Sequence, residues 1–178
     1  MSNKKYTPFF CEENIWHLLP DTEEPVRHRC YVLFLTNRNS SIALLNQKAA
    51  PPDEYIIWDY HVILYNDLEK CIYDFDTLLG FKNELTFYFR GTFGHQSFIR
   101  PDFRTTILKI PAQAYLDGFY SDRSHMIDKM GRALKPFPEH DPITSGKEFS
   151  LTDLIALNKK VCKSFELYTP DDFLRHNS

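Results

Sequence analysis

The sequence has 178 residues, a net charge of -3 and 43% hydrophobic residues, which is an ordinary balance for a globular chain. This length supports one hydrophobic core, so we expect residues 1–178 to form a single domain. The sequence contains neither a basic run nor an apolar run of the roughly 18–20 residues that span a membrane. Nucleic-acid binding and membrane attachment are therefore disfavoured.

The N-terminal segment and the cysteines indicate a reducing compartment. No apolar region of a secretory signal follows the first lysines, so we expect a cytoplasmic protein, with the nucleus as a second compartment. The four cysteines are far apart and lack the paired spacing of a zinc site. We expect Cys30, Cys71 and Cys162 to be free thiols in the core. No surplus amphipathic surface demands a partner, so we expect a monomer.

The first half of the chain predicts one helix followed by hairpins. Apolar residues at helical spacing begin at Cys11, and Pro20 ends the pattern. Residues 30–37 and 41–47 flank a turn-like polar stretch and predict a hairpin. Residues 55–65 and 70–79 predict a second hairpin around 66–69.

The second half mixes helices, a strand and a long loop. Residues 84–93 fit either a helix or a strand, and the helix is favoured. Residues 104–110 predict a strand, and residues 111–120 predict a helix with Pro111 near its first turn. Residues 131–149 predict a surface loop. Two further helices are expected at 150–161, capped by Ser150, and at 169–176, capped by Thr169 with Pro170 in the first position. Together these elements predict an α+β domain.

Cys11 is the first candidate for chemistry because it opens the predicted N-terminal helix. The partial positive charge of a helix N-terminus favours a thiolate, so the pattern predicts a lowered pKa for Cys11. The free N–H groups of the first turn could also hold an oxyanion. The alternative is a buried structural thiol, since free cysteine is among the most buried residue types.

His61 is the second candidate because it lies within an apolar strand. Alternation places Asp59, His61 and Ile63 on one face of this strand. A two-residue hairpin loop would put His61 opposite Asp74, and a four-residue loop would put it opposite Asp76; the pattern does not choose between them. A core histidine bonded to a backbone carbonyl is the alternative. With Cys11, a His–Asp pair follows the logic of papain-like enzymes.

Several longer segments carry a family resemblance. YTPFFCEENIW, IIWDYHVILY, IYDFDTLL, KIPAQAYLDGFYSDRSHM and SLTDLIAL resemble segments of protein N-terminal glutamine amidohydrolases, from Tyr6 to Phe173. The resemblance implies a papain-related, transglutaminase-like α+β fold, with the nucleophile on an N-terminal helix packed on an antiparallel sheet. It also implies deamidation of N-terminal glutamine on proteins or peptides, which yields ammonia and a glutamate that feeds the N-degron degradation pathway.

The resemblance assigns the nucleophile to Cys11, the base to His61 and its acid to Asp74. These residues would act through a thioester, without a metal or an organic cofactor. The sequences GTFGHQSFIRPD and 131–149 depart most from the family, which leaves the rim of the site undefined.

A carboxylate near the nucleophile should bind the cationic α-amine of the substrate. The candidates are Glu12, Glu13, Asp59, Asp76 and Asp122, of which Asp76 is favoured. The motif SDRSHM, with Ser124, would line this subsite or form a loop held by Asp122 and Arg123, and His125 is a reserve base. Trp16 and Trp58 are expected in the core.

Two other functions fit the same residues. A cysteine peptidase or a transglutaminase would use the same Cys–His–Asp set on another carbonyl group or acceptor. An inactive module that binds N-terminal residues would keep the cavity without the chemistry.

Overall fold

A six-stranded antiparallel sheet forms the centre of the molecule, in the strand order β10-β7-β1-β4-β5-β6. The computed structural model describes residues 6–178. The strands of this sheet are β1 (Cys30–Thr36), β4 (His61–Asn66), β5 (Cys71–Tyr73), β6 (Lys82–Glu84), β7 (Thr106–Pro111) and β10 (Glu166–Tyr168). Two short pairs lie outside it: β2 (Ile42–Leu44) with β3 (Ile56–Trp58), and β8 (Phe119–Tyr120) with β9 (Phe149–Ser150).

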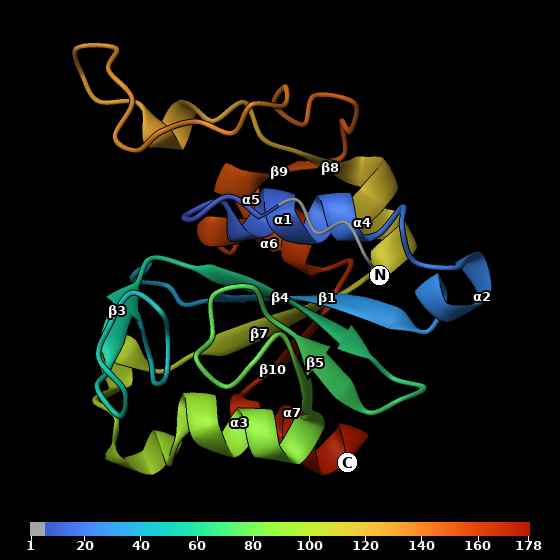
Figure 1. The fold of residues 1–178 in the computed structure, drawn as a ribbon, viewed down its shortest axis with the longest axis vertical. Coiled ribbons are helices and arrows are strands. Elements are labelled where there is room, and N and C mark those ends of the chain that lie inside the picture. The colour runs from blue at the N-terminus through green and yellow to red at the C-terminus, as the bar shows by residue number, and fades with distance from the viewer. Residues whose placement is uncertain (1–5) are drawn as a thin grey trace.

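Helices cover both faces of the sheet, as Figure 1 shows, so the molecule has three layers. One face carries α1 (Cys11–Leu18), α4 (Ala112–Gly118), α5 (Leu151–Ile155) and α6 (Lys159–Cys162). The other carries α3 (Leu85–Phe93) and α7 (Pro170–Asn177), and a short α2 (Glu24–Arg27) precedes β1. Each face has its own hydrophobic cluster, built around Val32, Val62 and Leu64 on the α1 side and Leu33, Ile63 and Tyr65 on the α3 side. The predicted α+β class is confirmed.

Local capping explains where several helices begin. Glu84 accepts hydrogen bonds from the N–H groups of Thr86 and Phe87 at the start of α3. Ser150 and Asp153 form a capping box at α5, and Thr169 caps α7 with Pro170 in its first turn. The predicted helix at 84–93, the strand at 104–110 and these caps are confirmed.

The first predicted hairpin is wrong. β1 lies in the middle of the sheet and uses both of its edges for β4 and β7, which leaves no edge for residues 42–44. Asn37 shapes the loop instead, since its Oδ1 accepts from Asn39 and Ser41 while its Nδ2 donates to the carbonyl groups of Asp102 and Arg104. β2 therefore leaves the main sheet and pairs with β3.

Two predicted elements are each divided in the structure. Residues 55–65 break at Asp59, whose carboxylate accepts from the N–H of Tyr60, so that β3 and β4 belong to different sheets. Residues 150–161 break at Leu157, which has a φ of 48°, and Asn158 then caps α6. Both breaks rest on local side-chain bonds that compete with the regular backbone ladder. The structure also contains elements that were not predicted, namely α2, β6, β8, β9 and β10.

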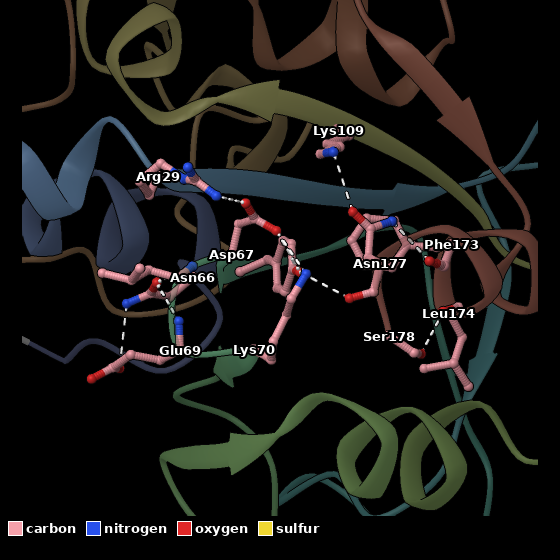
Figure 2. A network of polar contacts seen from close by, with 12 residues as sticks. Arg29, Asn66, Asp67, Glu69, Lys70, Lys109, Phe173, Leu174, Asn177 and Ser178 are labelled. Carbon is pink, nitrogen blue, oxygen red and sulfur yellow. Dashed lines mark hydrogen bonds and ion pairs between the residues drawn. The ribbon is translucent and has the colours of Figure 1, made fainter.

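A polar network at the end of the sheet sets the pairing of β4 with β5. Asp67, in the turn, lies between Arg29 and Lys70, and Asn66 accepts hydrogen bonds from the N–H groups of Leu68 and Glu69 (Figure 2). The resulting four-residue turn pairs Asn66 with Cys71 and Leu64 with Tyr73. This register, extended along the strands, brings residues 74–76 beside His61.

Within residues 6–178, no helix combines the length and apolar character needed to cross a membrane.

Candidate active site

A cavity of about 190 Å³ joins the start of α1, the start of β4 and the segment after β5. Its walls are formed by Phe9, Cys11, Trp58, Asp59, Tyr60, His61, Asp76, His125, Met126, Leu134 and Lys135. Cys11 and His61, the two candidates from the sequence, therefore line the same cavity. It is smaller than the roughly 300–1,000 Å³ of pockets for drug-sized ligands, and its size suits a single residue.

The arm before α1 is fixed by a side chain of the helix itself. Asn14 accepts a hydrogen bond from the N–H of Thr7 at 2.8 Å and donates to its carbonyl group at 2.9 Å. Phe9 turns the chain with a φ of 71°, and Phe10 is fully buried at the N-cap. Cys11 is consequently held at the first position of α1, next to β4.

His61 and Asp74 form a buried pair. The distance from Nε2 of His61 to Oδ1 of Asp74 is 3.0 Å, and the residues are only 2% and 1% exposed. Asp74 also accepts hydrogen bonds from the N–H of Asp76 and the hydroxyl group of Tyr88. The indole ring of Trp58 stacks on the imidazole ring of His61, with centroids 6.4 Å apart.

Burial and pairing act against each other in the pKa values of these two groups. Burial would raise the pKa of Asp74, but the charge and hydrogen bond of His61 hold this pKa below its ordinary value. Burial would lower the pKa of His61, but the Asp74 carboxylate outweighs burial and raises it. The carboxylate therefore orients the ring and stabilises its protonated form.

The predicted lowering of the Cys11 pKa is wrong for the resting protein. Cys11 is 8% exposed, and burial, followed by the charges of Glu12 and Asp76, raises the pKa of its thiol well above the ordinary value. A hydrogen bond from the backbone of Val62 acts in the opposite direction without offsetting these effects. The dipole of the eight-residue helix α1 is a smaller influence than desolvation. Cys11 is thus a protonated thiol before substrate binds.

Asp76 is the buried carboxylate of the cavity wall. It is 9% exposed, and Oδ1 accepts a hydrogen bond of 2.7 Å from the hydroxyl group of Tyr6. Burial is the largest influence on the pKa of Asp76 and raises it. Asp59 also lines the cavity but is exposed, and its carboxylate already caps Tyr60.

The other predicted amine-binding residues do not line this cavity. Glu13 is fully buried on another side of α1, where the Arg123 guanidinium donates to both of its carboxylate oxygens at 2.8 and 2.7 Å. Arg123 therefore pairs with Glu13 rather than with Asp122. Asp122 and Ser124 are exposed residues of a neighbouring hollow, where the N–H of Ser124 donates to Asp122.

Among residues 6–178, two groups of side chains have the residue types and spacing of metal ligands. Ligand atoms of Glu13, His17 and His140 lie within 4.8 Å of one another. Arg123 occupies both oxygens of Glu13 and donates to the carbonyl group of His140, so a positive charge already faces this group. In the second group, of His61, Asp74 and Asp76, Nε2 of the histidine and Oδ1 of each aspartate already take part in hydrogen bonds.

Several residues of the cavity were not found from the sequence. Trp58 was expected in the core but is half-buried in the cavity wall. Leu134 and Lys135 come from the loop 131–149, which carried no pattern. Tyr88, whose hydroxyl group holds Asp74, lies on a correctly predicted helix, but only the tertiary packing of α3 shows its contact. Trp16 packs against the core as expected.

The fold and site define an α+β protein whose cavity joins a helix-initial cysteine to a histidine–aspartate pair. A family model described as N-terminal glutamine amidase matches residues 6–176. Protein N-terminal glutamine amidohydrolases from Homo sapiens and Danio rerio are 36% and 35% identical to this chain. These matches cover 88% and 96% of the chain, and 80% and 88% of the human and fish proteins.

A third relative with the same name, from Drosophila melanogaster, is 34% identical over 89% of this chain and 81% of its own length. The chain belongs to the N-terminal glutamine amidase family and is an amidohydrolase. The resemblance described above is confirmed, including its extent along the sequence.

Proposed function

We propose that this protein deamidates the N-terminal glutamine of proteins and peptides by covalent catalysis at Cys11. The observation that carries the proposal is the cavity, which combines the Cys11 thiol, His61 paired with Asp74, and the buried Asp76 carboxylate. A thiol and a paired imidazole suit attack on a carboxamide. A buried carboxylate in the same small space suits a cationic α-amine. The names of the relatives support the same substrate.

The reaction would begin with proton transfer, because the resting thiol is protonated. Nε2 of His61 is bonded to Asp74, which leaves Nδ1 to take the Cys11 proton as the sulfur attacks the carboxamide carbon of glutamine. The N–H groups at the start of α1 would hold the tetrahedral oxyanion. His61 would then return the proton to the departing ammonia. Attack of water on the thioester would release glutamate and restore the thiol.

The arrangement also supports a papain-related, transglutaminase-like assignment of the fold. In that architecture a cysteine at a helix N-terminus faces a histidine on an antiparallel sheet, and a carboxylate or amide orients the histidine. Here α1 packs against β4, which begins at His61, and Asp74 directly follows β5. The proposed product, N-terminal glutamate, would enter the N-degron pathway, which degrades proteins according to their first residue.

Three matched peptides test the proposed function. They begin with glutamine, acetyl-glutamine and asparagine, and both ammonia release and peptide mass are followed. We expect ammonia from the free glutamine peptide alone, with the peptide chain intact. Asp76 would bind only a cationic amine, and the small cavity would bring the carboxamide to Cys11 for only one length of side chain. Chain cleavage or equal use of the acetylated peptide would indicate a peptidase or a general deamidase. Transfer to an added amine would indicate a transglutaminase, and an absence of turnover would indicate a binding module.

Replacing Asp76 by Asn should weaken substrate binding more than it slows the chemical step. The change removes the negative charge opposite the α-amine but keeps the size of the side chain and its bond with Tyr6. Charge-assisted hydrogen bonds contribute about 1.5–3 kcal/mol, so KM should rise by at least about tenfold while kcat changes less. Asp122→Asn is the matched control, because Asp122 lies outside the cavity. An unchanged KM in the Asp76 variant would show that the amine binds elsewhere.

A further inference from the structure

Glu12 is a fully buried carboxyl group in contact with the nucleophile. Its side chain is 0% exposed, and its Oε2 lies 3.7 Å from Sγ of Cys11. Oε2 also accepts a hydrogen bond of 2.9 Å from the hydroxyl group of Tyr60. Among residues 6–178, no group donates a hydrogen bond to Oε1, whose neighbour at 3.9 Å is Nε2 of His125. The mechanism above gives this group no role.

The surroundings of Glu12 contain no guanidinium or ammonium partner within the described chain. The titratable groups that face it come from α1, from the segment before β4, from β4, from α4 and from the turn after β8; they are Cys11, Glu13, Tyr60, His61, Tyr115 and His125. Arg123 directs Nε and Nη2 to the carboxylate of Glu13, and Nη2 also donates to the carbonyl group of His140. Burial is the largest influence on the pKa of Glu12 and raises it to about 8.

A carboxylate at this position would oppose the charge that forms on Cys11. The thiolate that attacks substrate is negative, and a second negative charge 3.7 Å away in a buried site would suppress it. The uncharged acid has the opposite effect, because its O–H can donate to the sulfur. We propose that Glu12 is a positioning residue of the nucleophile: its uncharged carboxyl group donates a hydrogen bond to the Cys11 thiolate, and its ionised form suppresses that thiolate.

Tyr60 allows the hydrogen bonds around Glu12 to rearrange as the thiolate forms. Its hydroxyl group lies 2.9 Å from Oε2 of Glu12 and 3.4 Å from Nε2 of His125. In the resting state Oε2 accepts from both the Cys11 thiol and Tyr60. When His61 takes the thiol proton, Tyr60 can donate to His125 instead, and the acid proton of Glu12, held on Oε2, can then face the sulfur. Burial lowers the pKa of His125, which keeps its ring able to accept.

The pH dependence of Cys11 alkylation tests this inference, which rests on the proposed role of Cys11. Iodoacetamide labelling is measured at Cys11 by peptide mass for wild type, Glu12→Gln, Glu12→Met and the exposed control Glu54→Gln. Alkylation involves no substrate amine, whose own titration near pH 8 would obscure a turnover profile. Gln keeps a donor but cannot ionise, and Met fills the space without a donor.

We expect Glu12→Gln to match wild type within about threefold near pH 6.5 and to exceed it by at least about tenfold near pH 9.5, where wild-type Glu12 is ionised. Glu12→Met should react at least about fivefold more slowly than Glu12→Gln near pH 6.5. Glu54→Gln should follow wild type throughout. Parallel curves for wild type and Glu12→Gln would overturn the proposal, because a purely structural role cannot depend on pH in this way.

Tyr60→Phe provides a second measurement that does not alter Glu12 itself. The lost hydroxyl group stabilises the Glu12 carboxylate, so its removal should move the alkaline suppression of alkylation upward by about one pH unit. An unmoved profile would contradict the proposal.

Alkylation and ammonia release are independent readouts. The expected labelling pattern without ammonia release would refute the proposed function alone, and ammonia release with parallel labelling curves would refute the role of Glu12 alone.

Discussion

Replacing Cys11 by Ala should abolish ammonia release from a peptide that begins with glutamine. Loss of a covalent nucleophile costs about 10³–10⁶ in rate in enzymes of this chemistry, which would place the variant at the buffer background. The thiol is small and lies at the cavity wall, so the free energy of unfolding should fall by only about 1 kcal/mol. Ammonia release and urea unfolding, measured on the same preparation, separate lost chemistry from lost folding.

Cys162→Ala is the matched control for this experiment. Cys162 is a buried cysteine at 9% exposure, close to the 8% of Cys11, but it lies on α6 and does not line the cavity. The same atom is therefore removed from a similar environment, and activity should be retained within about twofold. Activity that survives in Cys11→Ala, or that is lost equally in both variants, would contradict the assignment of the nucleophile.

Replacing Asp74 by Asn should reduce kcat by about 10²–10⁴ without preventing alkylation of Cys11. The amide keeps the shape of the carboxylate but cannot stabilise a protonated His61 or hold its ring in the same tautomer. Asp74 also binds Tyr88 and the N–H of Asp76, so the variant leaves buried donors with poorer acceptors. Breaking a buried pair of this kind costs about 3–5 kcal/mol of stability, which urea unfolding would detect.

The same variant should change the acid limb of the activity profile. His61 must be neutral to accept the thiol proton, and Asp74 raises the pKa of His61 above its ordinary value. Without the carboxylate, burial dominates and lowers that pKa. The remaining activity of Asp74→Asn should therefore persist to lower pH than that of the wild type, as measured by kcat/KM. An acid limb at unchanged or higher pH would show that the Asp74–His61 pair does not control this step.

The free energy of unfolding should depend on pH in the way that the directions of the Asp74 and His61 pKa shifts require. The lowered pKa of Asp74 contributes stability above its unfolded value near pH 4 that is lost as pH falls through the folded pKa. The raised pKa of His61 contributes stability below about pH 6.5 that is lost as pH rises through the folded pKa. In Asp74→Asn the first contribution disappears and the second reverses its sign, because burial then lowers the pKa of His61. The free energy of unfolding of this variant should therefore fall, instead of being retained, as pH decreases through about 6.5. Asp76→Asn keeps the pair but removes the raised pKa of Asp76 and one of the charges that raise the pKa of His61, so its stability should keep the same sign of pH dependence near pH 6.5 with a smaller amplitude.

The helices and their caps were largely determined by local sequence. The signals that start a helix act within one helical turn, so their spacing in the sequence is enough to predict where the helix begins. Examples are Ser150 with Asp153, Thr169 with Pro170, and the start of α1 at Cys11. The alternation of Tyr60, Val62 and Leu64 against Ile63 likewise follows from strand geometry, and the structure assigns these residues to opposite faces of the sheet.

The strand partners were decided by tertiary structure. Residues 42–44 follow β1 closely, and local reasoning paired them. In the structure β1 instead lies in the middle of the sheet, where β4 pairs with one of its edges and β7 with the other. β10 is a short edge strand whose residues are mostly exposed. Its sequence carries no strand pattern, and only its pairing with β7 makes it a strand. Pairing depends on which distant edges are free, and a local window does not contain that information.

For the candidate site, the sequence by itself predicted Cys11 and His61 and left the acid open between Asp74 and Asp76. The four-residue turn places Asp76 opposite His61 in register, yet the chain leaves the strand after Tyr73 and Asp74 makes the contact. The state of Cys11 was also decided by tertiary structure. A helix N-terminus predicts a thiolate, but enclosure by the sheet and by Glu12 produces a protonated thiol, because desolvation depends on everything that surrounds a group.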